Sequence, residues 1–295
     1  MTIPFFDRFM EPDGAVLPSL PNLRFKTLGG CQFWADVHYE QGWRIQENVV
    51  TGHFRLLDSH DVRHAWGGYE ACAARLADLT VAPSQDSEHL VILLHGLGRT
   101  RRSMNGLKRR LTAAGYKTVS LTYPSTRGDA AGHARRLGRL MTRLNGVARV
   151  SFVTHSFGGI VLRHVLASDA PWRGKIDVHG AVLLAPPNRG SRMAEWLKRN
   201  ILFRLIAGPA GQCLATSEAH LMPPVHVRHL VVAGARGDGR GWNPLLSGDD
   251  DGVVSVAETL PEMNGQFRAI RSGHTFIMNR PDAQAFILDF LAARR

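Results

Sequence analysis

The chain has 295 residues, of which 44% are hydrophobic and 21% are charged, and it carries a formal net charge of +11. This length and composition suit a globular protein with a large core, as one α/β domain or two smaller ones. No run of about 18 apolar residues occurs, so we expect no membrane-spanning helix. The opening residues lack a basic start followed by a long apolar run, so we expect no secretory signal and a cytoplasmic location.

The positive charge is spread over small groups along the chain. A basic excess favours nucleic acid or an anionic membrane surface as a partner when it gathers in one block. No such block interleaved with aromatic residues is present, so we predict a solvated basic surface and no nucleic-acid partner. Peripheral contact with a membrane and the oligomeric state stay open. The basic groups are Arg99/Arg101/Arg102, Lys108/Arg109/Arg110, Arg135/Arg136/Arg139/Arg143 and Lys198/Arg199.

Three cysteines, Cys31, Cys72 and Cys213, lie far apart in the sequence, without a CxxC motif or the Cys/His spacing of a metal site. We expect three buried thiols in a reducing compartment and no bound metal.

Residues 1–85 differ in pattern from the rest of the chain. Alternating apolar and polar residues predict strands joined into an antiparallel meander. A helix is predicted to follow, with Cys72, Leu76 and Leu79 on one face. We expect this part to extend the main sheet; a small accessory layer is the alternative. The predicted strands are 32–39, 43–50 and 53–57, and the predicted helix is 69–79.

From Leu90 onward the pattern alternates between strand and helix. Leu90–Leu94 is a continuous apolar run, which is typical of a parallel strand covered on both faces. Repeated βα units predict an α/β fold over residues 86–295, with a mostly parallel central sheet, helices on both faces, and functional residues in loops at the carboxyl ends of the strands. The further predicted strands are 117–121, 150–154, 178–185, 229–234 and 266–270, and the predicted helices are 103–114, 130–144, 158–167 and 281–294.

Residues 150–159 carry the most informative motif, Val-Ser-Phe-Val-Thr-His-Ser-Phe-Gly-Gly. A buried strand is predicted to end just before Ser156 and a helix to begin just after it. Such a sharp turn raises the serine hydroxyl above the edge of the sheet and directs the positive end of the helix at any negative charge that develops there. Gly158 and Gly159 keep the turn free of clashes. Ser156 is therefore a candidate nucleophile; a serine that only caps a helix is the alternative.

This motif in its setting resembles the α/β-hydrolase superfamily, and particularly its bacterial lipases and esterases, over about Leu90 to Leu291. One departure is Thr154, which stands where the pentapeptide of the family usually begins with glycine; some members are similar in carrying alanine or threonine there. The resemblance implies an α/β-hydrolase fold in which Ser156 attacks an ester carbonyl.

Residues 93–98, Leu-Leu-His-Gly-Leu-Gly, follow the first predicted parallel strand and resemble the His-Gly oxyanion loop of the same family. Acyl transfer creates a negatively charged oxygen that fixed backbone N–H groups stabilise. The resemblance implies that these donors are the amides of Leu97 and Phe157. The alternative is a glycine-rich turn without a catalytic role.

The base and the acid of such a site are selected by their positions. His274 lies after the last predicted strand and before the C-terminal helix, where the resemblance implies a catalytic histidine. A neutral imidazole can take the proton of the serine and return it to the leaving group. The segment Gly-Asp-Asp-Asp-Gly-Val-Val looks like the Asp-Gly-x-Val segment of related lipases and selects Asp251 as the acid that orients the imidazole. Asp249, Asp250 and, more remotely, Asp238 stay as alternatives.

Two further segments bear on the site. Residues 185–191 resemble a Pro-x-x-Arg-Gly-Ser stretch of the superfamily and are expected to shape the site, with Ser191 capping a helix that runs to about Arg199. Residues 196–224 are rich in apolar groups, so they are a lid or acyl-binding cap, or a helix packed on the core. Some lipases that the chain resembles bind calcium near the histidine loop, but the three aspartates lack the alternating spacing of an EF-hand, so we predict no metal.

These observations predict a serine hydrolase that cleaves small-molecule or lipid carboxylic esters through an acyl-enzyme and needs no cofactor. An acyltransferase on the same fold is the nearest alternative. A non-catalytic protein that binds through its basic surface is an alternative from another class.

Overall fold

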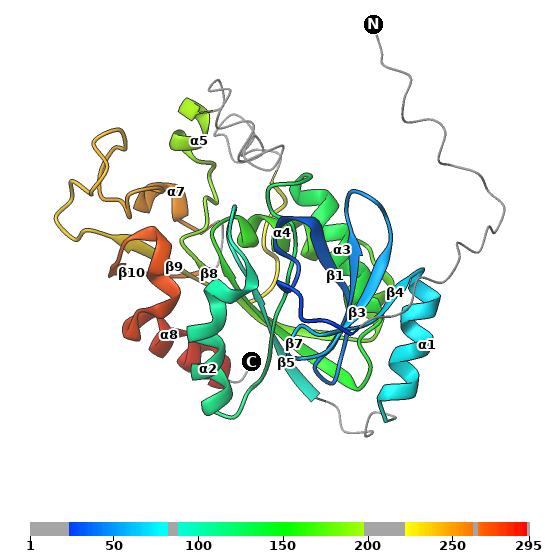
Figure 1. Cartoon of the computed structure of the whole chain (residues 1–295). Coiled ribbons are helices and arrows are strands. Elements are labelled where there is room, and N and C mark those ends of the chain that lie inside the picture. Colours follow the sequence, from blue (N-terminus) through cyan, green and yellow to red (C-terminus); the bar gives the residue numbers. More distant parts are fainter. Residues whose placement is uncertain (1–23, 82–87, 198–221, 262–264, 294–295) are drawn as a thin grey trace, which may run out of the picture.

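A computed structural model of the chain describes residues 24–81, 88–197, 222–261 and 265–293. Six strands form the central sheet in the order β10-β9-β8-β7-β5-β6 (Figure 1). Every neighbouring pair is parallel, as the alternating pattern predicts. The strands are β5 (Glu88–Leu94), β6 (Lys117–Ser120), β7 (Val147–His155), β8 (Asp177–Leu184), β9 (His229–Ala235) and β10 (Gln266–Arg271).

Helices cover both faces of this sheet (Figure 1). Val91 and Leu93 of β5 pack in one apolar cluster, with α2 and α8, whereas Leu90, Ile92 and Leu94 pack in another, with α3 and α4. The continuous apolar run of β5 follows from this burial on two sides. The helices are α2 (Asn105–Ala113), α3 (Ala130–Thr142), α4 (Phe157–Ala167), α5 (Arg192–Leu197), α7 (Val256–Thr259) and α8 (Pro281–Ala292), and the 3-10 helices of this part are η2 (Arg101–Met104), η3 (Pro171–Gly174) and η5 (His274–Asn279).

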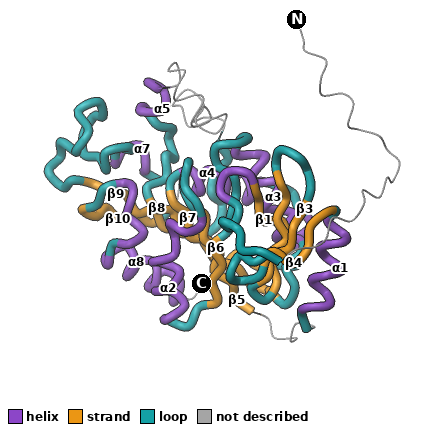
Figure 2. Tube along the Cα trace, viewed as in Figure 1, coloured by secondary structure: helices purple, strands orange, loops and turns teal. Residues whose placement is uncertain are grey.

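The N-terminal strands form a separate sheet, in the order β1-β2-β3-β4. The expectation that residues 1–85 extend the main sheet is therefore wrong for the described part of this region; the four strands form a second, antiparallel layer beside α3 (Figure 2). The predicted helix has the expected bounds, and its residues Cys72 and Leu76 are buried. The elements are η1 (Cys31–Phe33), β1 (Trp34–Glu40), β2 (Trp43–Asn48), β3 (Phe54–Leu57), β4 (Arg63–Gly67) and α1 (Tyr69–Leu79).

The two sheets meet through buried polar groups. Asp36 of β1 is 4% exposed, and its backbone amide donates to the Thr122 carbonyl just after β6 at 2.9 Å. The Thr122 amide donates in turn to Asp36 Oδ2 at 2.7 Å, and Gln46 Nε2 donates to Asp36 Oδ1 at 2.7 Å. Asp36 thus faces the six-stranded core domain rather than solvent. Both Asp36 and Gln46 are hydrogen-bonded, which avoids the cost of an unpaired buried polar group.

The cysteines differ from the expectation of three buried thiols. Cys72 is buried, and burial raises the pKa of its thiol to about 12. Cys31 is exposed, because it begins the short helix η1 directly after Gly30, a residue with φ of 105° at the edge of the N-terminal sheet. Cys213 and most of the predicted lid segment 196–224 lie outside the described residues.

No helix in the described part of the chain combines the length and the apolar character needed to cross a membrane.

Candidate active site

Ser156 occupies a strained turn between β7 and α4. Its backbone has φ of 51° and ψ of −121°, a conformation that side-chain-bearing residues rarely adopt. The Ser156 amide donates to the carbonyl of Leu184 at 2.8 Å, which ties the turn to the end of the neighbouring strand β8. Ser156 also takes the N-cap position of α4, so its hydroxyl lies beside the positive end of that helix.

Glycines allow three backbone segments to converge around this turn. A Cβ atom on Gly158 would lie 2.8 Å from the carbonyl oxygens of Leu94 and His95, closer than real contacts allow. A Cβ atom on Gly96 would lie 3.3 Å from Ser156 Cβ, so the loop after β5 passes directly beside Ser156. The predicted role of Gly158 as a small residue at a close approach is therefore confirmed.

Thr154, which replaces the usual glycine of the pentapeptide, fits inside the core. It is fully buried, and a Cβ atom on Gly159 would lie 3.4 Å from its Oγ1. The absence of a side chain on Gly159 thus leaves room for the threonine.

Asp251 and His274 form a close pair at the same edge of the sheet. The His274 Nδ1–H donates to Asp251 Oδ2 at 2.7 Å, and the His274 amide donates to the Asp251 carbonyl at 2.9 Å. The second carboxylate oxygen of Asp251 accepts from the amides of Val253 and Val254 at 3.0 and 2.8 Å. These bonds fix the tautomer of His274 and leave its Nε2 as an acceptor.

The other candidate acids have different partners. Asp249 accepts from the amides of Arg236 and Gly237 at 2.8 and 2.9 Å. Asp250, fully buried, accepts from three amides of the loop that precedes and follows it. Asp238 forms a surface ion pair with Arg236 at 2.9 Å. Among these four aspartates, only Asp251 contacts His274, and the others hold the loop in place.

His155 joins the nucleophile turn to the histidine loop and was missed by the sequence analysis. Its Nε2–H donates to the backbone carbonyl of His274 at 2.9 Å, and the two rings lie 4.9 Å apart. The ring is 1% exposed, and desolvation by burial lowers the pKa of His155 well below its ordinary value, so it stays neutral. Its position directly before Ser156 was the only signal available, since fourteen histidines are present. His155 thus ties the backbone at His274 to the residue directly before Ser156, and no hydrogen bond joins the Ser156 hydroxyl to His274 among the described residues.

The loop after β5, which passes beside Ser156 at Gly96, leaves the Leu97 amide without an acceptor among the described residues. The carbonyl of Gly96 accepts from His95 Nδ1 at 2.9 Å and from the amide of Arg99 at 3.3 Å. Because a trans peptide is planar, holding that carbonyl directs the amide of Leu97 the opposite way. In the described part of the chain, no group accepts a hydrogen bond from the Leu97 amide. Phe157 is the first residue of α4, so its amide has no acceptor within the helix.

Buried aromatic and imidazole rings support this loop. His95 stacks on Tyr123 with ring centres 4.2 Å apart, and the Tyr123 hydroxyl donates to the His95 carbonyl. His133 of α3 lies against Tyr123 and Phe157 at 5.2 and 6.0 Å. Burial lowers the pKa of both His95 and His133 to about 4, so both rings are neutral at neutral pH.

Metal-binding geometry is not formed by the described residues. No group of three or more His, Cys, Asp or Glu side chains that could hold an ion occurs among them. The carboxylates of Asp249 and Asp250 are instead occupied by backbone amides.

Solved structures of other proteins have a similar architecture. The fold is similar to that of a Bacillus licheniformis lipase in its mature form, with a TM-score of 0.56 and 17% identity over 71% of this chain and 94% of that one. It is also similar to a metagenomic carboxyl esterase, with a TM-score of 0.52 and 17% identity over 72% of this chain and 76% of that one. At such low identity these similarities establish the fold alone. No curated protein matches the sequence.

A sequence-based family model agrees with the structural comparison. The model of the alpha/beta hydrolase family matches residues 91–286, which include the β5 loop, the Ser156 turn and the Asp251–His274 pair. The match spans most of the chain and nearly all of the six-stranded part. This chain therefore belongs to the alpha/beta hydrolase family.

Proposed function

We propose that the protein is a serine hydrolase that cleaves carboxylic esters through an acyl-enzyme. The observation that supports this most directly is the 2.7 Å contact between His274 Nδ1 and Asp251 Oδ2, at the sheet edge that also carries the strained Ser156 turn. The alpha/beta hydrolase fold and the lipase and esterase neighbours agree with an ester as the substrate.

In this mechanism His274 Nε2 accepts the hydroxyl proton while Ser156 Oγ attacks the ester carbonyl carbon. The carbonyl oxygen becomes an oxyanion that accepts from the amides of Leu97 and Phe157. The imidazolium, stabilised by the Asp251 carboxylate, then protonates the alkoxide as the C–O bond breaks. Water repeats the same steps on the acyl-enzyme and releases the acid, so the cycle needs no cofactor.

The proposal is tested by p-nitrophenyl ester cleavage in the parent and in Ser156→Ala. We expect the activity to fall by at least about 1000-fold, because the nucleophile is removed. Ser168→Ala is a matched control, since its hydroxyl lies at the far end of α4 and donates to the Val165 carbonyl at 2.7 Å. Persistent activity in pure Ser156→Ala protein would remove Ser156 from this role.

Whether water or an alcohol accepts the acyl group is determined by a separate measurement. Product analysis with added alcohol distinguishes a hydrolase, which releases mainly acid, from an acyltransferase, which forms a new ester. The predicted lid would influence this choice through solvent access, but most of it lies outside the described residues. The cytoplasmic location and the lack of a nucleic-acid partner stay predictions from the sequence.

A further inference from the structure

Gln32, at the edge of the N-terminal sheet, links three segments that are distant in sequence. Its Nε2 donates to the Arg99 carbonyl at 2.8 Å and to Ser125 Oγ at 3.4 Å. Its Oε1 accepts from the Thr126 amide at 3.0 Å and from the Thr126 hydroxyl at 2.9 Å. All four hydrogen-bonding positions of the carboxamide are therefore used.

The groups that Gln32 contacts hold the loop that presents the Leu97 amide. Ser125 is fully buried, and its Oγ accepts from the Gly98 amide at 3.0 Å. The Arg99 amide donates to the Gly96 carbonyl at 3.3 Å, on the opposite side of the peptide from the Leu97 N–H. Gln32 and Ser125 thus fix the loop on the carboxyl side of Leu97. Among the described residues, no side chain from a helix of the core domain donates a hydrogen bond to the Arg99 carbonyl as Gln32 does.

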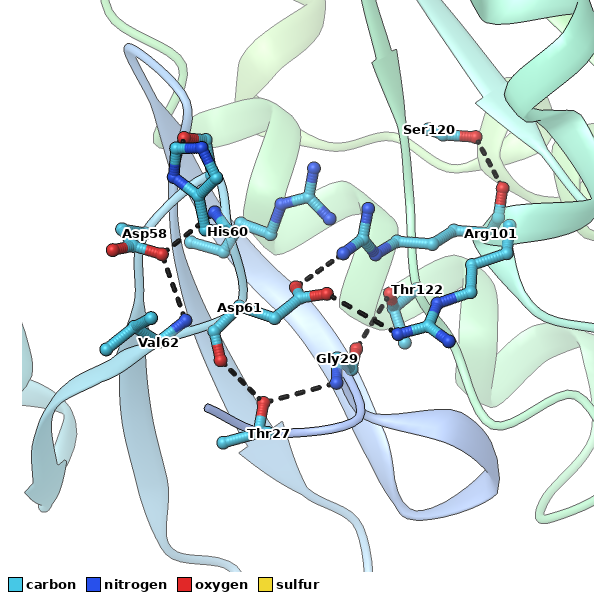
Figure 3. Close-up of polar contacts among 12 residues, drawn as sticks. Thr27, Gly29, Asp58, His60, Asp61, Val62, Arg101, Ser120 and Thr122 are labelled. Carbon is cyan, nitrogen blue, oxygen red and sulfur yellow. Dashed lines mark hydrogen bonds and ion pairs between the residues drawn. The ribbon is translucent and has the colours of Figure 1, made fainter. Parts of the chain in front are cut away.

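A second contact, from the turn between β3 and β4, holds the chain just beyond this loop. Figure 3 shows the carboxylate of Asp61 directed at Arg101, with which it forms an ion pair; Arg102 lies 4.0 Å away on the other carboxylate oxygen. On the core side, the Ser120 hydroxyl donates to the Arg101 carbonyl at 3.1 Å (Figure 3). The loop is therefore restrained by the N-terminal sheet at Arg99 and again at Arg101.

We infer that Gln32 is a positioning residue for the oxyanion donor Leu97, and that the N-terminal sheet braces the oxyanion loop. The catalytic part of this inference rests on the proposed function. Residues 24–81 lie outside the family match of 91–286, so the core domain obtains part of its catalytic geometry from a segment that the family model does not include.

The physical basis is preorganisation of the donor. A backbone amide stabilises an oxyanion only when it is held at the position where the negative charge develops, because reorientation during the reaction costs free energy. Loss of a whole donor typically costs about 100- to 1000-fold in kcat. Loosening the donor loop without deleting the amide should cost less, so we expect about 10- to 100-fold.

The test compares Gln32→Glu and Gln32→Leu with the parent on a soluble p-nitrophenyl ester. Gln32→Glu keeps the size but places a carboxylate oxygen against the Arg99 carbonyl, and Gln32→Leu removes all four bonds. We expect kcat to fall about 10- to 100-fold with KM changed by less than about threefold, since the donor acts on the transition state. Gln41→Glu is the matched control; Gln41 lies in the turn between β1 and β2, and its Nε2 donates to the Val81 carbonyl at 2.9 Å, away from the loop. A kcat within about twofold of this control in both variants would overturn the inference.

Amide hydrogen exchange gives a readout that does not depend on activity. Peptides covering Gly98 and Arg99 should exchange faster in Gln32→Leu than in the parent, and at the parent rate in Gln41→Glu. Peptides from β7 and α4 should exchange at the parent rate in both variants. Unchanged exchange at Gly98 and Arg99 would overturn the brace, and faster exchange throughout the core would mean a general structural role instead. A parent without any esterase activity would overturn the proposed function, and the catalytic part of the inference with it.

Discussion

The two sides of the candidate site are supported in different ways. The Asp251–His274 pair finds its partners within the core domain, in the Val253 and Val254 amides and in His155. The loop after β5 is instead contacted at Arg99 by Gln32, which lies in η1 directly before the first strand of the N-terminal sheet. The Asp251–His274 contact thus forms within the family-matched core, whereas the loop that carries Leu97 is also held from the N-terminal layer.

The central sheet and the N-terminal sheet also differ in the contacts that hold them in place. The central sheet packs apolar side chains against helices on both faces, so its stability comes mainly from apolar burial. The N-terminal sheet shares an apolar cluster with α1, but it meets the core domain through buried polar groups such as Asp36, whose carboxylate accepts from the Thr122 amide. Directional contacts of this kind define the position of a loop more sharply than apolar packing does.

The largest expected effect is on the acid side of the site. Asp251→Asn should lower kcat by about 10³- to 10⁴-fold, because an amide no longer holds the required tautomer of His274 or stabilises its imidazolium. Steady-state cleavage of a p-nitrophenyl ester measures it. Asp249→Asn is the control and should stay within about tenfold of the parent, since the Asp249 carboxylate accepts from amides of the 236–239 loop and from the Asp250 amide. A deficit confined to Asp249→Asn would assign the acid to that residue.

A smaller effect is expected where the two sides join, at His155. His155→Leu removes the N–H that holds the His274 carbonyl and should lower kcat by about 10- to 100-fold by displacing the base. His155→Gln keeps an N–H donor and should recover part of the loss. If both variants have the kcat and the pH–rate profile of the parent, His155 does not position the base.

Packing at the nucleophile turn can be tested by stability. Gly158→Ala places a Cβ atom 2.8 Å from the carbonyls of Leu94 and His95, so it should reduce the free energy of unfolding by about 1–3 kcal/mol. Gly174→Ala, with nothing within 4 Å of the added atom, should leave it nearly unchanged. Urea denaturation of both variants measures the difference, and equal stabilities would mean that the segments around Ser156 are not closely packed.

A stability effect of similar size is the pH dependence contributed by His133. Its pKa is about 4 in the fold and about 6.5 when unfolded, so only the unfolded chain gains a proton between these values. This contribution to stability is complete above pH 6.5 and is lost as the pH falls toward 4. When the pH is lowered from 7 to 5, the free energy of unfolding of His133→Phe should therefore fall by about 2 kcal/mol less than that of the parent. Denaturation at both pH values, with the exposed His60→Gln as control, measures this; an unchanged pH dependence in His133→Phe would contradict the burial of a neutral imidazole.

The sequence predicts the central sheet well because its signals are local. The apolar run at Leu90–Leu94 and the motif around Ser156 each combine a buried strand, a turn and a glycine requirement within about ten residues. The strand expected at 150–154 begins earlier, at Val147, because Val147 and Arg149 pair with the first two residues of β5. The selection of Asp251 among neighbouring aspartates came from resemblance, and the contact with His274 agrees with it.

The N-terminal layer could be predicted only in part, because its contacts are polar and long-range. Strand β4, Arg63–Gly67, has one fully buried side chain and no alternating pattern, so it was not predicted. The role of Gln32 depends on partners 67 and 94 residues away, at Arg99 and Thr126. A single glutamine in the sequence carries no sign of such partners, and the same holds for the bond between His155 and His274.

The most direct test of the central claim is the rate and site of labelling by a fluorophosphonate, read by intact mass and peptide mapping. We predict a single adduct on Ser156 in the parent, and a labelling rate at least about 100-fold lower in His274→Ala, because the hydroxyl then has no base to accept its proton. An adduct on another residue, or equal labelling rates in the parent and His274→Ala, would contradict the assignment of Ser156 as a nucleophile activated by His274.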